Sequence, residues 1–169
     1  MARRPGNLVQ VDTFYVRLLP GKEMKQFTFT DVFSRWSVAF LAHDATAHSA
    51  RRAFAEAMKR MPFAIRAVQV ERGPEFMSAF EEDLQRRGLP LFELPPRSPK
   101  LNGCVERTNR TYRDDFCNCS TDEPNIKAMS RGLRQYETVY NTVRQALGYL
   151  TPAEFLAHHY QKEALSDRS

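Results

Sequence analysis

The sequence predicts an α/β domain in which a mixed sheet is flanked by helices. Three apolar segments with strand character come first, and two more short strands then alternate with helical segments. No glycine-rich phosphate loop follows any of these strands, so nothing in the pattern favours a doubly wound nucleotide-binding fold. The chain has 169 residues, of which 42% are hydrophobic, and this is enough for one sizeable core. We therefore expect a single domain over residues 1–169.

The first half of the chain predicts four strands and one helix. Residues 8–19 and 25–33 are rich in β-branched and aromatic side chains, and the turn sequence Pro-Gly-Lys-Glu between them predicts a hairpin. Residues 37–43 predict a third strand. Apolar residues then recur at helical spacing over 45–61, and a short apolar strand follows over 65–71.

The second half predicts four helices and a fifth strand. Pro74 begins the first of these helices and Gly88 ends it. Thr151 and Glu154 form a capping box around Pro152, which predicts a last, short helix. The other elements are a strand at 89–94, a mobile loop rich in proline at 95–103, a helix at 102–116, a break at 117–124 and a helix at 125–143.

The charge of the chain favours an acidic partner. The net charge is +5, and the segment from Leu94 to Arg113 carries five basic residues against one acid, so it holds most of the excess. No apolar run is long enough to cross a bilayer, and the first residues do not form a signal peptide. We expect a cytoplasmic protein with no membrane partner.

The cysteines and histidines do not predict a metal centre. Cys104, Cys117 and Cys119 are odd in number and lack paired spacing, so neither a disulfide framework nor a zinc site is indicated. None of the four histidines has a cysteine partner at ligand spacing. We expect reduced cysteines without a catalytic role.

Three acids stand at informative places. Asp12 interrupts the first strand, Glu71 ends the fourth, and Glu106 shares a helical stripe with Arg110 and Arg113. Taken alone, each acid fits a solvated surface. For Glu106, an i, i+4 pair with Arg110 contributes only a few tenths of a kcal/mol. If the three carboxylates converge, their mutual repulsion requires divalent cations, and Mg²⁺ prefers oxygen ligands.

Five segments in order resemble the integrase catalytic core of bacterial insertion-sequence transposases and retroviral integrases. They cover residues 8–156, almost the whole chain, and their joint occurrence is far more specific than any single acid. The segments are LVQVDTFYV, TDVFSRW, VQVERGPEF, SPKLNGCVERTNRTYRDDF and YNTVRQALGYLTPAEFL.

The resemblance implies a ribonuclease H-like fold with a five-stranded mixed sheet, and it implies a site. By motif, Asp12, Glu71 and Glu106 match the three acids that hold two Mg²⁺ or Mn²⁺ ions in this family. The two glutamates lie 35 residues apart, 71 to 106, a spacing common in the family. Lys100, Arg107, Arg110 and Arg113 are the expected contacts to backbone phosphates of double-stranded DNA.

The position of Glu71 departs from the family pattern. Related proteins have aspartate followed by asparagine here, whereas this chain has Glu71 and Arg72. One extra methylene moves the carboxylate by roughly 1.5 Å, the length of a carbon–carbon bond, and Mg²⁺ requires accurately placed ligands. A second departure is the absence of the usual proline and histidine after Arg144.

Three functions are compatible with these residues. The first is DNA cleavage and strand transfer in transposition by two-metal chemistry, in which one ion activates the nucleophile and the other stabilises the leaving oxygen. The second is a degenerate core that only binds DNA or dimerises, and the third is a ribonuclease H-type nuclease. The resemblance also implies a homodimer or larger assembly, with the helix around residues 133–141 as a possible interface, and a DNA-end-binding domain that is absent here.

Overall fold

A five-stranded sheet forms the centre of the protein. The computed structural model describes residues 2–19, 22–71, 73–95, 99–118 and 125–166. The strand order is β3-β2-β1-β4-β5, and β1 pairs antiparallel with β2 but parallel with β4, so the predicted mixed sheet is confirmed. In chain order the elements are β1 (Val9–Leu19), β2 (Lys22–Asp31), β3 (Ser37–Ala42), α1 (Ala47–Arg60), β4 (Val68–Glu71), the 3₁₀ turn η1 (Pro74–Phe76), α2 (Ala79–Arg86), β5 (Leu91–Leu94), α3 (Pro99–Tyr112), the π-helical turn η2 (Arg113–Cys117), α4 (Ile126–Thr142) and α5 (Pro152–Ser166).

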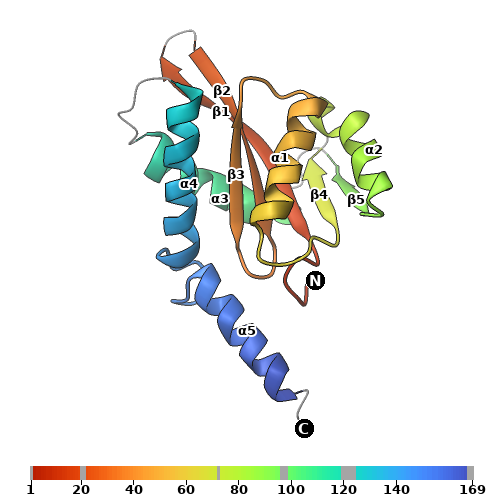
Figure 1. The fold of residues 1–169 in the computed structure, drawn as a ribbon, viewed down its shortest axis with the longest axis vertical. Coiled ribbons are helices and arrows are strands. Elements are labelled where there is room, and N and C mark those ends of the chain that lie inside the picture. Colours follow the sequence, from red (N-terminus) through yellow and green to blue (C-terminus); the bar gives the residue numbers. More distant parts are fainter. Residues whose placement is uncertain (1, 20–21, 72, 96–98, 119–124, 167–169) are drawn as a thin grey trace.

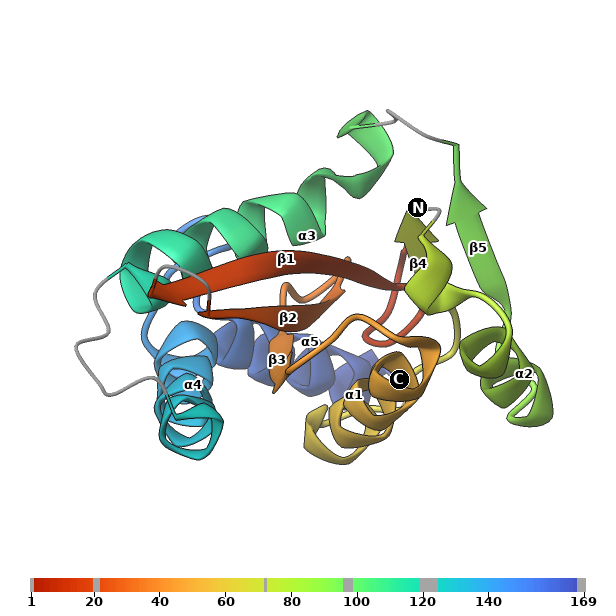
Figure 2. The same ribbon diagram turned by 90° about the horizontal axis from the view of Figure 1, so that it is seen from above.

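Helices cover both faces of the sheet. Figure 2 shows α3 on one face and α1 on the other, with α2 beside α1. The alternation of side chains along β1 explains the two layers, because residues two apart share a face. Val9 and Val11 join a buried cluster with Phe54 of α1, whereas Phe14 joins a second cluster with Tyr112 of α3. The sheet therefore separates two hydrophobic cores.

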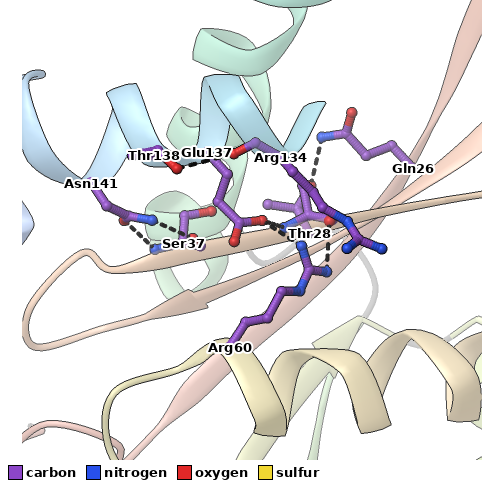
Figure 3. A network of polar contacts seen from close by, with 9 residues as sticks. Gln26, Thr28, Ser37, Arg60, Arg134, Glu137, Thr138 and Asn141 are labelled. Atoms are coloured by element: carbon purple, nitrogen blue, oxygen red, sulfur yellow. Dashed lines mark hydrogen bonds and ion pairs between the residues drawn. The ribbon is translucent and has the colours of Figure 1, made fainter. Parts of the chain in front are cut away.

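The outer edge of β3 is closed by side chains rather than by another strand (Figure 3). Asn141 of α4 accepts a hydrogen bond from the Ser37 N–H at 2.9 Å and donates one to the Ser37 carbonyl at 2.8 Å. Glu137 accepts from the Ala39 N–H at 3.0 Å, and Arg60 of α1 donates to the Ala39 carbonyl at 2.9 Å. Arg60 and Glu137 also pair with each other at 2.9 Å. These contacts satisfy backbone groups that would otherwise invite edge-to-edge pairing.

The last helix extends beyond the end of α4 but stays in contact with the rest of the fold, since the rings of Phe155 and His159 pack against Phe33. Figure 1 shows α5 extending away from the sheet beyond the end of α4. Its predicted capping box is confirmed, since Glu154 accepts from the Thr151 N–H at 2.8 Å and the Thr151 hydroxyl accepts from the Glu154 N–H at 3.2 Å. The helix has 15 residues and is longer than predicted. None of the helices in the described parts of the chain is both long and apolar enough to span a membrane.

Two predicted helix boundaries were wrong. The helix expected over residues 74–88 is split into η1 and α2, because Ser78 has a φ of 50° that a continuous α-helix does not allow. The loop expected over residues 95–103 ends early, since α3 already begins at Pro99. Proline is tolerated in a first helical turn, where its missing N–H has no partner to lose. Residues 96–98 of that loop, and 119–124 of the predicted break, lie outside the described residues.

Candidate active site

Asp12 and Glu71 lie on neighbouring strands. β1 and β4 are parallel, and their ladder pairs Val9 with Val68 and Val11 with Val70. Asp12 and Glu71 follow directly after that last pair. Side chains at matching positions of parallel strands about 4.8 Å apart point to the same face of the sheet. The fold thus places the two acids next to each other on the face covered by α3.

Helix α3 carries Glu106 along this face. The Gln10 side chain joins the layers, since it donates to the Gln69 side chain at 2.7 Å and accepts from the Val105 N–H at 3.2 Å. Val105 is fully buried, whereas the adjacent Glu106 is exposed at the flank of the helix. Glu106 therefore stands at the solvent boundary of the layer that contains Asp12.

The Asp12 carboxylate is held by two donors. Its Oδ1 accepts from the Thr13 N–H at 2.8 Å, and its Oδ2 accepts from the Asn109 side-chain amide at 2.8 Å. The pKa of Asp12 is raised from 3.8 to about 6, mainly by burial; the negative charges of Glu71 and Glu106 add to the rise, and the two hydrogen bonds oppose it. Both glutamates are therefore close enough to Asp12 to repel it. This repulsion is of the kind that a bound cation relieves.

The donor types at this place fit a hard divalent cation. Three carboxylates are present, and Asn109, which donates to Asp12, buries a side-chain oxygen that has no hydrogen-bond partner among the described residues. The described parts of the chain nevertheless contain no group of three or more histidine, cysteine, aspartate or glutamate side chains placed so that they could hold a metal ion together. The ligand chemistry is in place, but the carboxylates do not form a closed coordination shell.

Two contacts near Asp12 were not predicted from the sequence. The Thr13 hydroxyl donates to the Glu75 carboxylate at 2.7 Å, which brings a fourth acid next to β1. The second contact is the bond from the Asn109 amide to Asp12, which spans 97 residues of sequence. Both pairs join segments that are distant in sequence, so no local pattern could have found them. Glu75 does follow Glu71 by four residues within the same motif, and this was the one available signal.

The basic residues predicted to contact DNA divide into two groups. Arg110 is exposed on α3 one turn after Glu106, and the Arg113 guanidinium lies 4.9 Å from the centre of the Phe14 ring. Arg107 lines a separate pocket with Arg35 and Arg144. The backbone of Lys100 belongs to α3, but its side chain lies outside the described parts, as does Arg72. The basic segment is therefore not one continuous surface.

Comparison with known proteins identifies the family. Two models described as integrase core domain match the chain, one over residues 2–99 and the other over residues 88–152. The chain is 29% identical over 161 residues to an uncharacterized 31.7 kDa protein of insertion element IS407 from Burkholderia multivorans. That alignment covers 92% of this chain and 57% of the relative, so the chain spans little more than half of the relative's length.

Solved structures of viral integrases share the fold. The catalytic core of BIV integrase matches with a TM-score of 0.68 at 18% identity, covering 94% of this chain and 99% of that one. The HTLV-2 integrase catalytic core, solved in complex with magnesium in a trimeric form, matches with a TM-score of 0.67 at 17% identity and covers 89% and 96%. A chain of the simian T-cell lymphotropic virus intasome matches at 0.74 and 18% identity, covering 90% of this chain and 54% of that one. The chain thus belongs to the integrase core domain family and has the ribonuclease H-like fold of retroviral integrase catalytic cores.

Proposed function

We propose that the chain is the catalytic core of a DNA transposase, which cleaves and joins DNA phosphodiester bonds in transposition with the help of Mg²⁺ or Mn²⁺. The observation that carries this proposal is the meeting of Asp12 and Glu71 at matching positions of two parallel strands, beneath the helix that bears Glu106. The raised pKa of Asp12 supports it, since two further carboxylates act on that group.

The three acids have distinct positions in this proposal. Asp12, Glu71 and Glu106 would together hold the ions, and both glutamates are close enough to Asp12 to raise its pKa. Bound ions of this kind activate a water or a DNA 3′ hydroxyl and stabilise the leaving oxygen. The Thr13 N–H and the Asn109 amide fix the Asp12 carboxylate, which limits its rotation. Glu106 is exposed at the flank of α3, so it is accessible from solvent.

The basic residues beside Glu106 would hold the substrate. Arg110 lies four residues after Glu106 and therefore on the same side of α3, and Arg113 continues that side. Guanidinium groups bind phosphate oxygens through paired hydrogen bonds. We assign Arg110, Arg113 and Lys100 to backbone phosphates of double-stranded DNA, which is the element end or the target. The reaction would take place in the bacterial cytoplasm, on a homodimer or larger assembly.

A second function has specific support. Both oxygens of Asp12 are engaged by protein donors, and the described residues hold no closed group of metal ligands. With glutamate at position 71, these facts suit a core that binds DNA or a sister transposase without cutting. Such a protein binds DNA in a metal-independent and salt-sensitive manner. A ribonuclease H-type nuclease is the third candidate, and it differs by acting on an RNA–DNA hybrid.

Nicking of supercoiled plasmid separates these functions. The parent chain is incubated with Mn²⁺ at low salt beside Glu106→Gln and Glu71→Asp, with the exposed Glu82→Gln on α2 as a control for charge. A transposase core nicks in the parent and in Glu82→Gln but not in Glu106→Gln. Nicking by Glu71→Asp alone identifies a silenced core. Absence of nicking in every variant, with DNA binding retained, contradicts the catalytic proposal, and cleavage of a hybrid alone points to the nuclease.

A further inference from the structure

A pocket lies on the flank of α3 that faces away from Glu106. Its volume is about 450 Å³, and three arginines line it, each from a different place in the fold. Arg35 comes from the turn between β2 and β3, Arg107 from α3, and Arg144 from the end of α4. Arg107 follows Glu106 by one residue, about 100° around the helix, and it lines the pocket together with Cys104 and Thr108 of α3, whereas Glu106 does not. Three basic side chains from separate elements thus converge at one hollow.

Four hydrogen bonds hold the turn that presents Arg35. Asp31 is fully buried, and its carboxylate accepts from the Gly6 N–H, the Ser34 N–H and the Ser34 hydroxyl at 3.0, 2.7 and 2.6 Å. The Arg35 N–H donates to the Asp31 carbonyl at 2.9 Å. These bonds fix the backbone that leads into Arg35, and its side chain reaches Cys104 in the wall of the pocket.

Arg35 itself has a backbone conformation that favours glycine. Its φ is 61°, and a residue with a Cβ loses roughly 1–2 kcal/mol there. Nothing in the turn geometry requires a long cationic side chain at this position, because glycine would fit the backbone better. Strain of this kind is kept where the side chain has a use. Arg35 contributes its charge to the pocket.

The walls of the pocket show how close the charges lie. Burial raises the pKa of the Cys104 thiol, and the charges of Arg35 and Arg107 oppose that rise, so both guanidiniums lie near this one sulfur. Two acids neighbour the arginines: Asp31 lies buried beneath Arg35, and Asp115 pairs with Arg144. The three arginines outnumber these two acids, and Arg107 has no ion pair among the described residues.

We propose that this pocket, with Arg35, Arg107 and Arg144, binds a backbone phosphate of a second DNA segment, on the opposite flank of α3 from the carboxylates. This inference rests on the proposed function, since strand transfer requires an element end and a target at the same time. The paired N–H groups of a guanidinium match phosphate oxygens, and an open pocket of this size admits a phosphodiester. Helix α3 would then lie between two DNA segments.

The test is DNA binding without metal, measured by fluorescence anisotropy in EDTA over a range of salt concentrations. Each phosphate contact contributes about 0.9 to the slope of log K against log salt, so loss of one contact weakens binding about eightfold at 0.1 M salt. Arg35→Gly suits this test because it removes the guanidinium and keeps a backbone that glycine tolerates. We expect Arg35→Gly and Arg107→Gln each to lower the slope by about 1, and Arg35→Lys to restore it, because lysine keeps the charge.

The control is Arg52→Gln, which removes the same charge from an exposed position on α1, across the sheet. Equal losses in the control and the pocket variants would overturn the proposal, since binding would then follow net charge alone. Loss in Arg110→Gln without loss in the pocket variants would also overturn it, while leaving the proposed function intact. The readout needs no catalysis, so failure to nick DNA does not affect it.

Alkylation of Cys104 is a second measurement of DNA binding in the pocket. Cys104 lines its wall and is half-buried, and DNA bound there should slow alkylation of this thiol, as followed by mass spectrometry of its peptide. We expect duplex DNA to protect Cys104 in the parent and not in Arg35→Gly. Equal protection by inorganic phosphate at the same ionic strength would identify a free-anion site, and unchanged labelling with DNA would contradict the assignment.

Discussion

Replacement of Asp12 by asparagine should make the protein more stable at neutral pH when no metal is present. The pKa of Asp12 is raised from 3.8 to about 6, a shift of about 2 pH units, which corresponds to about 3 kcal/mol at most. The side chain is only half-buried, so solvent screening reduces the expected gain to about 1–2 kcal/mol. Asn109 can accommodate the new amide, because its own oxygen has no partner among the described residues and can accept after a flip.

The size of this stabilisation depends on pH. A raised pKa in the folded state favours folding below pH 4, and that contribution is lost as the pH rises through about 6. The stability advantage of Asp12→Asn should therefore be near zero below pH 4, grow between pH 4 and 6, and stay constant above that. Urea unfolding in EDTA at five pH values measures this directly.

Replacement of the surface residue Asp44 is a control in which the expected change in stability has the opposite sign. Hydrogen bonds from Ser49 and Thr46 lower the pKa of Asp44, so Asp44→Asn should destabilise the protein at neutral pH, with the difference vanishing as the pH falls through that lowered pKa. An Asp12→Asn variant that is less stable than the parent at pH 7, or whose advantage does not change with pH, would refute the raised pKa of Asp12.

Three further results are expected. Asn141→Ala leaves the N–H and carbonyl of Ser37 without their partners, so it should lower the free energy of unfolding by about 2–4 kcal/mol in urea; a loss below 0.5 kcal/mol would show that water replaces the amide. Asn109→Ala frees one oxygen of Asp12 and should weaken Mn²⁺ binding about 10- to 100-fold in calorimetry; unchanged affinity would contradict its positioning role. Mn²⁺ binding should also weaken as the pH falls below about 6, where Asp12 takes up a proton, and an affinity that is constant down to pH 4 would exclude Asp12 as a ligand.

Local patterns in the sequence predicted most of the fold. The runs of β-branched and aromatic residues in the first strands, the capping box at Thr151 and the apolar spacing of α1 each depend on neighbouring residues, and each prediction was confirmed. The split at Ser78 was missed because a positive φ leaves no sign in a sequence with neither glycine nor asparagine at that point. The early start of α3 was missed because Pro99 indicates a loop and a first helical turn equally well.

The sequence named candidate residues for the site but not the contacts around them. The motifs named Asp12, Glu71 and Glu106, and the parallel pairing of β1 with β4 then placed the first two together. The division of the basic segment was not predictable, because the pocket at Arg107 also needs Arg35 and Arg144 from distant parts of the chain. The hydrogen bonds of Asp12 likewise depend on how α3 packs on the sheet.

A crystal structure with bound Mn²⁺ would test the central proposal most directly, because anomalous scattering locates the ion without assumptions about its ligands. We predict anomalous peaks between Asp12, Glu71 and Glu106, with the Glu106 side chain turned inward and oxygen atoms about 2.2 Å from the metal. Ions bound elsewhere, or a site in which Glu71 does not take part, would contradict a metal centre built from these three acids.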